Sequence, residues 1–444
     1  MSRGTIFALA TPPGRSGIAV MRLSGPSAGA TLLTLTGRPL PPARKAVRRA
    51  LRDPSTGETV DSALILWFPA PASFTGEDVA ELHLHGGRAV IASVINILAR
   101  QSGLRLAEPG EFTRRAFLAG KMDLTAVEGL ADLIDAETEA QRRQALRQMG
   151  GALAALYEGW RGRLLRVLAH AEAVIDFPDE DLPEDTNAQL QAEVAELRAE
   201  IAAHLGDSRR GERLREGVRV AIIGPANAGK SSLLNWLAGR DAAIVSAVAG
   251  TTRDVIEVHL DLGGYPVLLA DTAGLRETAD ALEEEGIRRA RRWAQEADYR
   301  ILLLDGLVVN DAHSIALIAQ ENPSIVVINK MDLMMSWPTG ATHQLDTLAI
   351  SVKSGQGMVE FLTHLEREVA RLAAPGEAPA LTRVRHRIAL EAAREALDRF
   401  ARSSSPDLAA EDLRLAVREI GRISGRVDVE DLLDVIFRDF CLGK

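Results

Sequence analysis

The spacing of hydrophobic and polar positions divides the chain into segments of different character. Up to about residue 118, short apolar runs alternate with turns rich in Pro and Gly, as in "GIAVMRLSG", "SALILWFP" and "DVAELHLHGG". Apolar runs of this length, bounded by turn residues, are typical of strands. Residues 1–118 are therefore predicted to form an α+β domain with a mostly antiparallel sheet.

The second segment, from Lys121 to about Arg215, has the spacing of helices. One apolar stripe recurs at steps of three and four residues and consists of Leu190, Val194, Leu197, Ile201 and Leu205. Such a stripe indicates one buried face of an α-helix. The stretch "IDFPDEDLPED" at 175–185 interrupts the pattern with prolines and acids, so we expect a loop there.

The third segment alternates strand-like runs with helical stretches. The runs are "VRVAIIG", "YPVLLAD", "RILLLD", "SIVVINK" and "TLAISV". Nearly continuous apolar runs are typical of parallel strands buried on both faces, so residues 216–375 are predicted to be a doubly wound α/β domain. The linker "APGEAPAL" at 374–381 follows it.

Helical periodicity returns from residue 376 to the end. Ser405-Pro406 has the form of an N-cap and a first helical residue. Two stripes follow, formed by Leu413, Val417 and Ile420 and by Leu432, Ile436 and Phe440. The simplest organisation is one helical domain, made of residues 119–215 and 376–444, into which the α/β domain is inserted.

Composition narrows the class of protein. The 444 residues are 46% hydrophobic and 25% charged, which suits two to four globular domains. A single cysteine rules out an internal disulfide, and no apolar run has a length that suits a signal peptide or a membrane span. We therefore expect a cytoplasmic protein. The net charge of −9 argues against general coating of nucleic acid but leaves room for a local basic patch, such as "TRVRHR" at 382–387.

The segment "GPANAGKSS" at 224–232 matches the phosphate-binding pattern G-x-x-x-x-G-K-[ST]. It follows a predicted strand and opens a predicted helix, which is the context that the pattern needs. Gly224 and Gly229 would let backbone amides wrap phosphates, Lys230 would reach the β- and γ-phosphates, and Ser231 would bind Mg²⁺. By itself, the pattern could also be an ordinary strand–helix turn that contains glycine.

Four further motifs follow in the order expected of a GTPase. "DTAG" (271–274) ends a strand and offers a carboxylate to the magnesium shell, and "GTTRD" (250–254) offers a switch threonine. "NKMD" (329–332) places Asp332 where it can pair with the N1–H and 2-amino group of guanine, and "SVK" (351–353) stands where a last base-contacting loop belongs. Together they predict GTP binding and hydrolysis.

At these motifs the α/β domain resembles a G domain of the translation-factor class. The rest of the chain, from about residue 5 onward, resembles the family of tRNA-modifying GTPases called MnmE or TrmE. The resemblance is carried by "ATPPGRSGIAVMRLSG", "SFTGEDVAELHLHGG", "EPGEFTRRAFLAGKMDL", "IDFPDED", "GTTRD", "DTAGLRET" and the terminal "CLGK".

The resemblance implies a function, cofactors and partners. It implies a homodimer held by the N-terminal domain, and a heterotetramer or larger complex with the FAD-dependent protein MnmG (GidA). Together the two would add a carboxymethylaminomethyl-type group to C5 of the wobble uridine of certain tRNAs, with a one-carbon unit from a tetrahydrofolate derivative (5-formyl- or methylene-tetrahydrofolate). The GTP contacts then map onto Asn227, Ala228, Gly229, Lys230, Ser231, Ser232, Ser246, Ala247, Val248, Ala249, Gly250, Thr251, Thr252, Asp271, Thr272, Ala273, Gly274, Asn329, Lys330, Asp332, Ser351, Val352 and Lys353.

The hydrolytic machinery departs from that of Ras-like enzymes. Leu275 follows the DxxG glycine where a water-orienting Gln would stand. The resemblance implies that Glu283 is the catalytic acid, although the run "LEEEG" (282–286) could also be solvated glutamates at a helix start. It further implies a potassium ion in place of an arginine finger. Its ligands would be Asn227, Ser246, Val248 and Thr251, with Ser231 and Thr252 on Mg²⁺. The other reading of Asn227 is a side chain that stabilises the loop.

Folate contacts map, by the same resemblance, onto Arg22, Glu81, Lys121 and Lys444. A carboxylate suits the N–H donors of the pterin, and basic groups suit the glutamyl tail. Because Arg22 lies on an apolar strand, it needs a partner or a ligand. An Arg22–Glu81 ion pair with no ligand is the equal alternative. His83 and His85 share one strand face without a third metal ligand and are taken as structural.

The lone cysteine, Cys441, lies in the terminal "FCLGK". Most single cysteines are buried packing residues, which is the default interpretation here. Because the family ends in this motif, we hypothesise that the tail docks at the N-terminal domain, where Cys441 assists the tRNA chemistry and Lys444 contacts the folate.

Two other functions remain open from the sequence. One is a ribosome-assembly or translation-type GTPase, which would be expected to carry an RNA module such as a KH domain. The other is a folate-dependent carrier whose G domain acts only as a switch.

Overall fold

The computed structural model describes residues 4–176, 186–239, 243–244, 257–271, 293, 295–308, 320–334, 346–374, 376, 378–403, 405–427, 430–438, 440 and 443. The chain forms two compact units. The first consists of Met1–Ala131 with Gly421–Lys444, and the second is Asp132–Ile420. Segments from both ends of the sequence therefore belong to the same unit.

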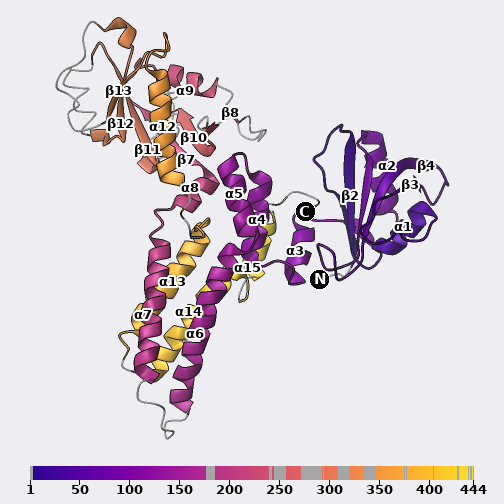
Figure 1. Cartoon of the computed structure of the whole chain (residues 1–444). Helices are drawn as coiled ribbons and strands as arrows, with labels where there is room; N and C mark the ends of the chain where they lie inside the picture. The colour runs from indigo at the N-terminus through magenta and orange to yellow at the C-terminus, as the bar shows by residue number, and fades with distance from the viewer. Residues whose placement is uncertain are drawn as a thin grey trace, which may run out of the picture. The chain divides into compact units, whose positions relative to one another are not determined.

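The first unit is built on a six-stranded sheet (Figure 1). Its strands, in spatial order, are β3 (Val47–Arg52), β4 (Thr59–Phe68), β5 (Val79–His85), β2 (Ile18–Ser24), β1 (Thr5–Leu9) and β6 (Leu104–Leu106). Neighbouring strands are antiparallel except β1 and β6, which are parallel. The predicted α+β fold with a mostly antiparallel sheet is confirmed.

The two faces of this sheet are covered differently. One face packs against α1 (Ala28–Thr36) and α2 (Arg88–Ala99), which together with the sheet bury Phe7, Met21 and Leu82. On the other face, Ile6 and Ala8 of β1 pack against Phe112 of α3 (Glu111–Leu118). Because Arg22 pairs with Ala8 and with Glu81 in the strand register, both charged residues lie on this second face.

The end of the chain packs onto the first unit. Helix α15 (Glu430–Arg438) contributes Leu433 and Phe437 to a buried cluster with Leu124 and Val127 of α4 (Leu124–Asp135). Gly110, just before α3, fits closely against α15, since a Cβ there would lie 2.6 Å from the carbonyl oxygen of Phe437. The C-terminal helix is therefore an integral part of the first unit.

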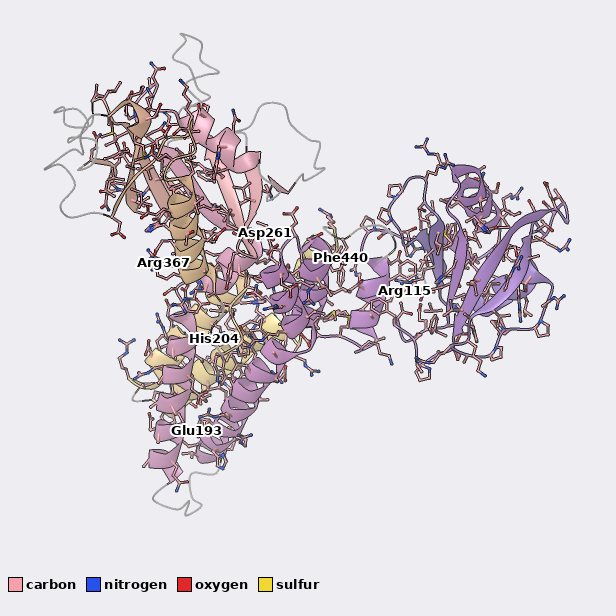
Figure 2. The ribbon with its side chains drawn as sticks, turned by 45° about the horizontal axis from the view of Figure 1, so that its top comes forward. Arg115, Glu193, His204, Asp261, Arg367 and Phe440 are labelled. Atoms are coloured by element: carbon pink, nitrogen blue, oxygen red, sulfur yellow. The ribbon has the colours of Figure 1, made fainter. Side chains whose placement is uncertain are left out.

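The second unit contains a group of long helices. They are α5 (Glu139–Met149), α6 (Ala152–Asp176), α7 (Thr186–Leu205), α13 (Val384–Phe400) and α14 (Pro406–Ser424), whose last four residues belong to the first unit. In α7, Val194, Leu197 and Ile201 are buried, as the apolar stripe predicted, and α14 begins at the predicted Pro406. Arg163 of α6 forms ion pairs with Glu193, Glu196 and Glu200 of α7, where Figure 2 labels Glu193.

The G domain in the second unit has a seven-stranded sheet. The spatial order is β13 (Thr347–Ala349), β12 (Ile325–Asn329), β11 (Tyr299–Asp305), β7 (Val218–Ile223), β10 (Tyr265–Asp271), β9 (Glu257–Leu262) and β8 (Ala243–Ile244). Strands β13 to β10 are parallel, as predicted. Strand β9 is antiparallel to β10, because Gly263 and Gly264 both adopt positive φ and form a tight hairpin turn.

Helices cover one face of the G-domain sheet and fix the core. Leu214 of α8 (Arg210–Glu216), Leu233 of α9 (Lys230–Ala238) and Leu365 of α12 (Met358–Ala373) are buried in one cluster with β7 and β10. The opposite face buries Leu302 and Val326 in a second cluster. This two-sided burial explains why the strands read as continuous apolar runs. The predicted multidomain fold with an inserted P-loop domain is confirmed.

The G domain is joined to the helices by charged contacts at its points of entry and exit. Asp132 accepts hydrogen bonds from Arg215 at 3.0 Å, just before β7, and from Arg383 at 2.7 Å, just before α13. Arg387 forms ion pairs with Asp207 and with a glutamate of α8, both at 2.9 Å. Within "TRVRHR", Arg383 and Arg387 therefore belong to an ion-pair network and do not form a free basic patch.

Candidate functional site

The phosphate-binding loop lies between β7 and α9. Gly224 has φ +140°, and a Cβ there would lie 2.1 Å from the carbonyl oxygen of Leu303 on β11. Only glycine fits at this position, because both the backbone conformation and the space exclude a side chain. Lys230 Nζ donates to the carbonyls of Gly224 and Pro225 at 2.8 and 2.9 Å, so its ammonium group lies within the curve of the loop.

The second glycine of the loop joins the phosphate motif to the base motif. Gly229 has φ +101°, and a Cβ there would lie 2.3 Å from Nδ2 of Asn329. Asn329 Nδ2 donates to the carbonyl of Ala228 at 2.8 Å, and its Oδ1 accepts the N–H of Val352 at 3.2 Å. The buried amide of Asn329 therefore ties the phosphate loop to the last base-contacting loop.

Asn227 has a left-handed backbone, with φ +64°, and is exposed. A left-handed asparagine is common in loops, so the conformation by itself fits the loop-stabilising role as well as a ligand role. Ser231 and Ser232 lie in the first turn of α9 and are exposed. Helix N-termini favour anions, and a serine hydroxyl here has the oxygen chemistry that Mg²⁺ prefers.

Contacts within the protein hold the side chains of the base motif in position. Asp332 is exposed and lies in a short 3₁₀ turn, and the hydroxyl of buried Ser351 donates to its Oδ1 at 2.7 Å. Lys330, whose φ is +64°, forms an ion pair with Asp305 at 2.6 Å. Burial by itself would raise the pKa of the Asp305 carboxyl, but the hydrogen bonds from Lys330 and from the Leu307 N–H lower it below its usual value. Lys353 is exposed at the edge of the same loop.

Of the DTAG motif, the structure describes Asp271. Asp271 is the last residue of β10, and its backbone pairs with Ile222 of β7. The following predicted residues lie outside the described part of the chain: Ser246, Ala247, Val248, Ala249, Gly250, Thr251, Thr252, Thr272, Ala273, Gly274 and Glu283. Their roles on Mg²⁺, K⁺ and the attacking water stay predictions.

A second cluster of polar groups lies on the face of the N-terminal sheet that α3 covers. Arg22 Nε and Nη2 approach Oε1 of Glu81 at 3.0 and 2.9 Å. The guanidinium lies 5.9 and 5.8 Å from the ring centres of Phe74 and Phe112, which adds cation–π contacts. The ion pair satisfies Arg22 without a ligand, so the folate role of Arg22 and Glu81 stays a prediction.

The loop at 73–78 brings the other N-terminal motifs to the same place. A Cβ at Gly76 would lie 3.3 Å from Cε of Lys121, an exposed lysine that makes no ion pair within the described residues. Glu77 accepts hydrogen bonds from Ser24 and Arg115, both at 2.8 Å. Figure 2 labels Arg115, which lies on α3. Phe74, Phe112 and Arg115 were not predicted as site residues, although all three lie in the motifs that carry the family resemblance.

The C-terminal tail reaches this cluster within the same unit. Gly443 has φ +95°, and a Cβ there would lie 2.4 Å from the carbonyl oxygen of Leu9. Its own carbonyl accepts a hydrogen bond from Arg22 Nη1 at 3.3 Å. Cys441 and Lys444 lie outside the described residues. Gly443 itself lies at β1 and β2, beside Arg22.

His83 and His85 have carboxylate partners. His83 lies 3.5 Å from Glu81, and His85 lies 2.7 Å from Asp61. Among the described residues, no group of three or more His, Cys, Asp or Glu could hold a metal ion. In the same part of the chain, no helix is both long enough and apolar enough to cross a membrane.

Comparison with known proteins covers almost the whole chain. Residues 5–121 match the family "GTP-binding protein TrmE N-terminus", and residues 124–441 match the MnmE helical domain. A tRNA modification GTPase MnmE of Paramagnetospirillum magneticum is 57% identical over 99% of each chain, and that of Parvibaculum lavamentivorans is also 57% identical, over 99% of this chain and all of the relative. The mitochondrial 5-taurinomethyluridine-[tRNA] synthase subunit GTPB3 of Danio rerio is 48% identical over 99% of this chain and 93% of the relative.

Proposed function

The chain belongs to the MnmE family of tRNA modification GTPases, and from that membership we propose that it hydrolyses GTP to drive modification at C5 of the wobble uridine of certain tRNAs. The observation that carries the GTPase part is the contact between Gly229 and Asn329, which joins the phosphate loop to the guanine motif. The tRNA part rests on the family. Membership of this family favours tRNA modification over ribosome assembly, the alternative function that the sequence left open.

GTP binding would use charges and dipoles that are already in position. The amides of 224–229 and the N-terminus of α9 would face the phosphates, and Lys230 would exchange its two loop carbonyls for phosphate oxygens. Asp332, oriented by Ser351, would accept the N1–H and the 2-amino group of guanine. Adenine lacks this pair of donors, so the same carboxylate would reject ATP.

The proposed ions fit the residues that are described. Ser231 would offer a hydroxyl to Mg²⁺ in the first turn of α9, and the exposed, left-handed Asn227 would offer its amide oxygen to K⁺. When bound, the two ions would neutralise the negative charge that develops on the phosphates during hydrolysis. Thr252 is proposed as a further ligand of Mg²⁺, and Ser246, Val248 and Thr251 as further ligands of K⁺. Glu283 is proposed to orient the attacking water.

The uridine chemistry is proposed to take place at the N-terminal domain. Arg22, Glu81, Lys121 and Lys444 would bind a tetrahydrofolate derivative, and Cys441 would assist the reaction on tRNA. Lys121 beside Gly76 and the Gly443 carbonyl on Arg22 support this arrangement, because they gather these elements within one unit. The working form is proposed to be a homodimer, joined by an FAD-dependent partner of the MnmG type, in a reducing cytoplasm.

The first test measures GTP hydrolysis, separately from tRNA modification. We expect GTP turnover by the full chain to be faster in potassium than in sodium buffer, and Asn227→Ala to abolish the difference while nucleotide binding is kept. Equal rates in both buffers for the unaltered protein would refute the potassium proposal. Glu283→Ala should bind GTP but barely hydrolyse it, whereas Glu284→Ala is the matched control and should be mild.

The role of Cys441 is tested in the reconstituted system with the FAD-dependent partner. Cys441→Ser should leave folding, GTP binding and GTP hydrolysis intact and abolish uridine modification, measured by mass spectrometry of tRNA nucleosides. Normal modification by this variant would show that Cys441 is only a packing residue.

A further inference from the structure

Six cations gather around the outer strand of the N-terminal sheet. Strand β3 is at one edge of the sheet, next to β4 (Figure 1). The segment 38–52 contains no acidic residue, although acids outnumber Lys and Arg by 61 to 52 in the whole chain. We call its six cations the basic edge: Arg38, Arg44, Lys45, Arg48, Arg49 and Arg52.

The fold brings these six residues together. The N–H of Arg44 donates to the carbonyl of Trp67 at 2.8 Å, so the chain already runs beside β4 before β3 begins. Arg49 donates to the carbonyl of Pro39, which brings the preceding loop back to the strand. All six cations are exposed except Arg49, which is half-buried.

The positive charge of the basic edge is not neutralised. Its hydrogen bonds go to uncharged oxygens, such as Ser62 Oγ for Arg48 and the Gly57 carbonyl for Arg52. None of the six forms an ion pair within the part of the chain that is described. Nearby carboxylates have other partners, because Asp53 binds Arg100 at 2.7 Å and Asp61 binds His85 at 2.7 Å.

Protection of the sheet edge explains only part of this cluster. Cations on an edge strand prevent pairing with another chain, which accounts for Arg48, Arg49 and Arg52. It does not account for the cations of the preceding loop, which lie outside the strand. One of them, Arg44, has φ +62°, a conformation that glycine or asparagine would adopt at lower energy. The Arg44 guanidinium donates to the carbonyl of Ala72, an uncharged acceptor that does not neutralise its charge.

We infer that the basic edge binds the phosphate backbone of RNA, and we propose tRNA as the occupant, a choice that rests on the proposed function. Guanidinium groups match phosphate geometry through paired hydrogen bonds. With a net charge of −9, the chain as a whole repels RNA, so binding needs a local cluster of positive charge. The surface carries charge rather than base-reading groups, so it would orient tRNA without choosing its sequence.

The test measures binding of unmodified tRNA to the full chain at several salt concentrations. The variant Arg44→Gly/Lys45→Ser/Arg48→Ser removes three charges, and its glycine suits the left-handed backbone at that position. The slope of log K against log salt should become shallower by about 2 to 3, since each lost phosphate contact contributes about 0.7 to 0.9. At 0.1 M salt, binding should weaken about tenfold or more.

The control variant loses the same charge from exposed arginines that already face glutamates. It is Arg142→Ser/Arg143→Ser/Arg371→Ser, because Arg142 and Arg143 pair with Glu139 and Arg371 pairs with Glu368. Its salt slope should match that of the unaltered protein. A charge-preserving variant, Lys45→Arg/Arg48→Lys, should also bind normally.

Each other result overturns the inference. An unchanged slope for the triple variant, an equal loss in the control, no tRNA binding by the unaltered chain, or tighter binding of poly-glutamic acid than of tRNA would each exclude an RNA-binding basic edge. Failure of the proposed function gives a different result. If the proposed function is wrong, the reconstituted system would leave wobble uridine unmodified with the unaltered chain and with every variant.

Discussion

Ser351 offers a direct test of how guanine recognition is built. Its hydroxyl is fully buried and donates to Asp332 Oδ1 at 2.7 Å, while Asp332 itself is exposed. In Ser351→Ala, the carboxylate would no longer be held in one rotamer. GTP would then have to order this side chain on binding, at about 0.5–1.5 kcal/mol. We expect GTP affinity to fall about two- to tenfold.

Affinity is best measured by titration of a fluorescent guanine nucleotide, with thermal unfolding as a check. Ser351 Oγ also accepts the N–H of Ser354 at 3.1 Å, so the variant should lose about 1 kcal/mol of stability as well. Ser354→Ala is the matched control on the same loop, because within the described residues the Ser354 hydroxyl accepts just one long contact, 3.4 Å from the Gln356 N–H. It should leave affinity unchanged.

A double-mutant cycle decides whether Ser351 acts through Asp332. In an Asp332→Ala background, Ser351→Ala should have almost no further effect on GTP affinity, because the carboxylate that it orients is gone. The same loss in both backgrounds would refute the reasoning. Asp332→Asn should shift preference from GTP towards xanthosine triphosphate, whose 2-oxo group suits an amide, and unchanged GTP binding would show that the motif is misassigned.

Three further predictions follow from particular contacts. Gly229→Ala should abolish nucleotide binding. The substitution adds about 1–2 kcal/mol of backbone strain and places a methyl group 2.3 Å from Asn329 Nδ2. Nucleotide affinity within threefold of that of the unaltered protein would contradict this prediction. Gly443→Ala should displace the tail from Leu9 and lower uridine modification while GTP hydrolysis stays normal, whereas intact modification would show that tail docking is dispensable. Burial lowers the pKa of His204 from 6.5 to about 4, so the unfolded chain binds a proton in this interval and the folded chain does not. Stability should therefore fall by up to about 3 kcal/mol as pH drops from 6.5 to 4. Urea unfolding at several pH values measures this loss. His204→Gln should reduce the loss, whereas the control His170→Gln, at an exposed histidine, should not. Equal pH profiles of stability for His204→Gln and the unaltered protein would contradict the lowered pKa of His204.

The sequence determined the local elements and the nucleotide motifs of this protein. The stripe at Val194, Leu197 and Ile201 and the apolar runs of the G domain predicted buried helix faces and strands, because these patterns repeat with the geometry of the backbone. The glycines of the phosphate loop were recognisable because no other residue fits their conformations. The Gly263-Gly264 turn was also present in the sequence, although the antiparallel β9 was not anticipated.

Only the tertiary structure decided which distant residues meet. Arg22 and Glu81 are 59 positions apart, and the register of β2 and β5 places them opposite each other. Phe112 stacks on the same guanidinium, and Gly443 reaches it from 421 positions away. The charge of the basic edge could be counted in the sequence, but the absence of carboxylate partners for it among the described residues could not. Such contacts depend on strand register and packing between elements, which local spacing does not encode.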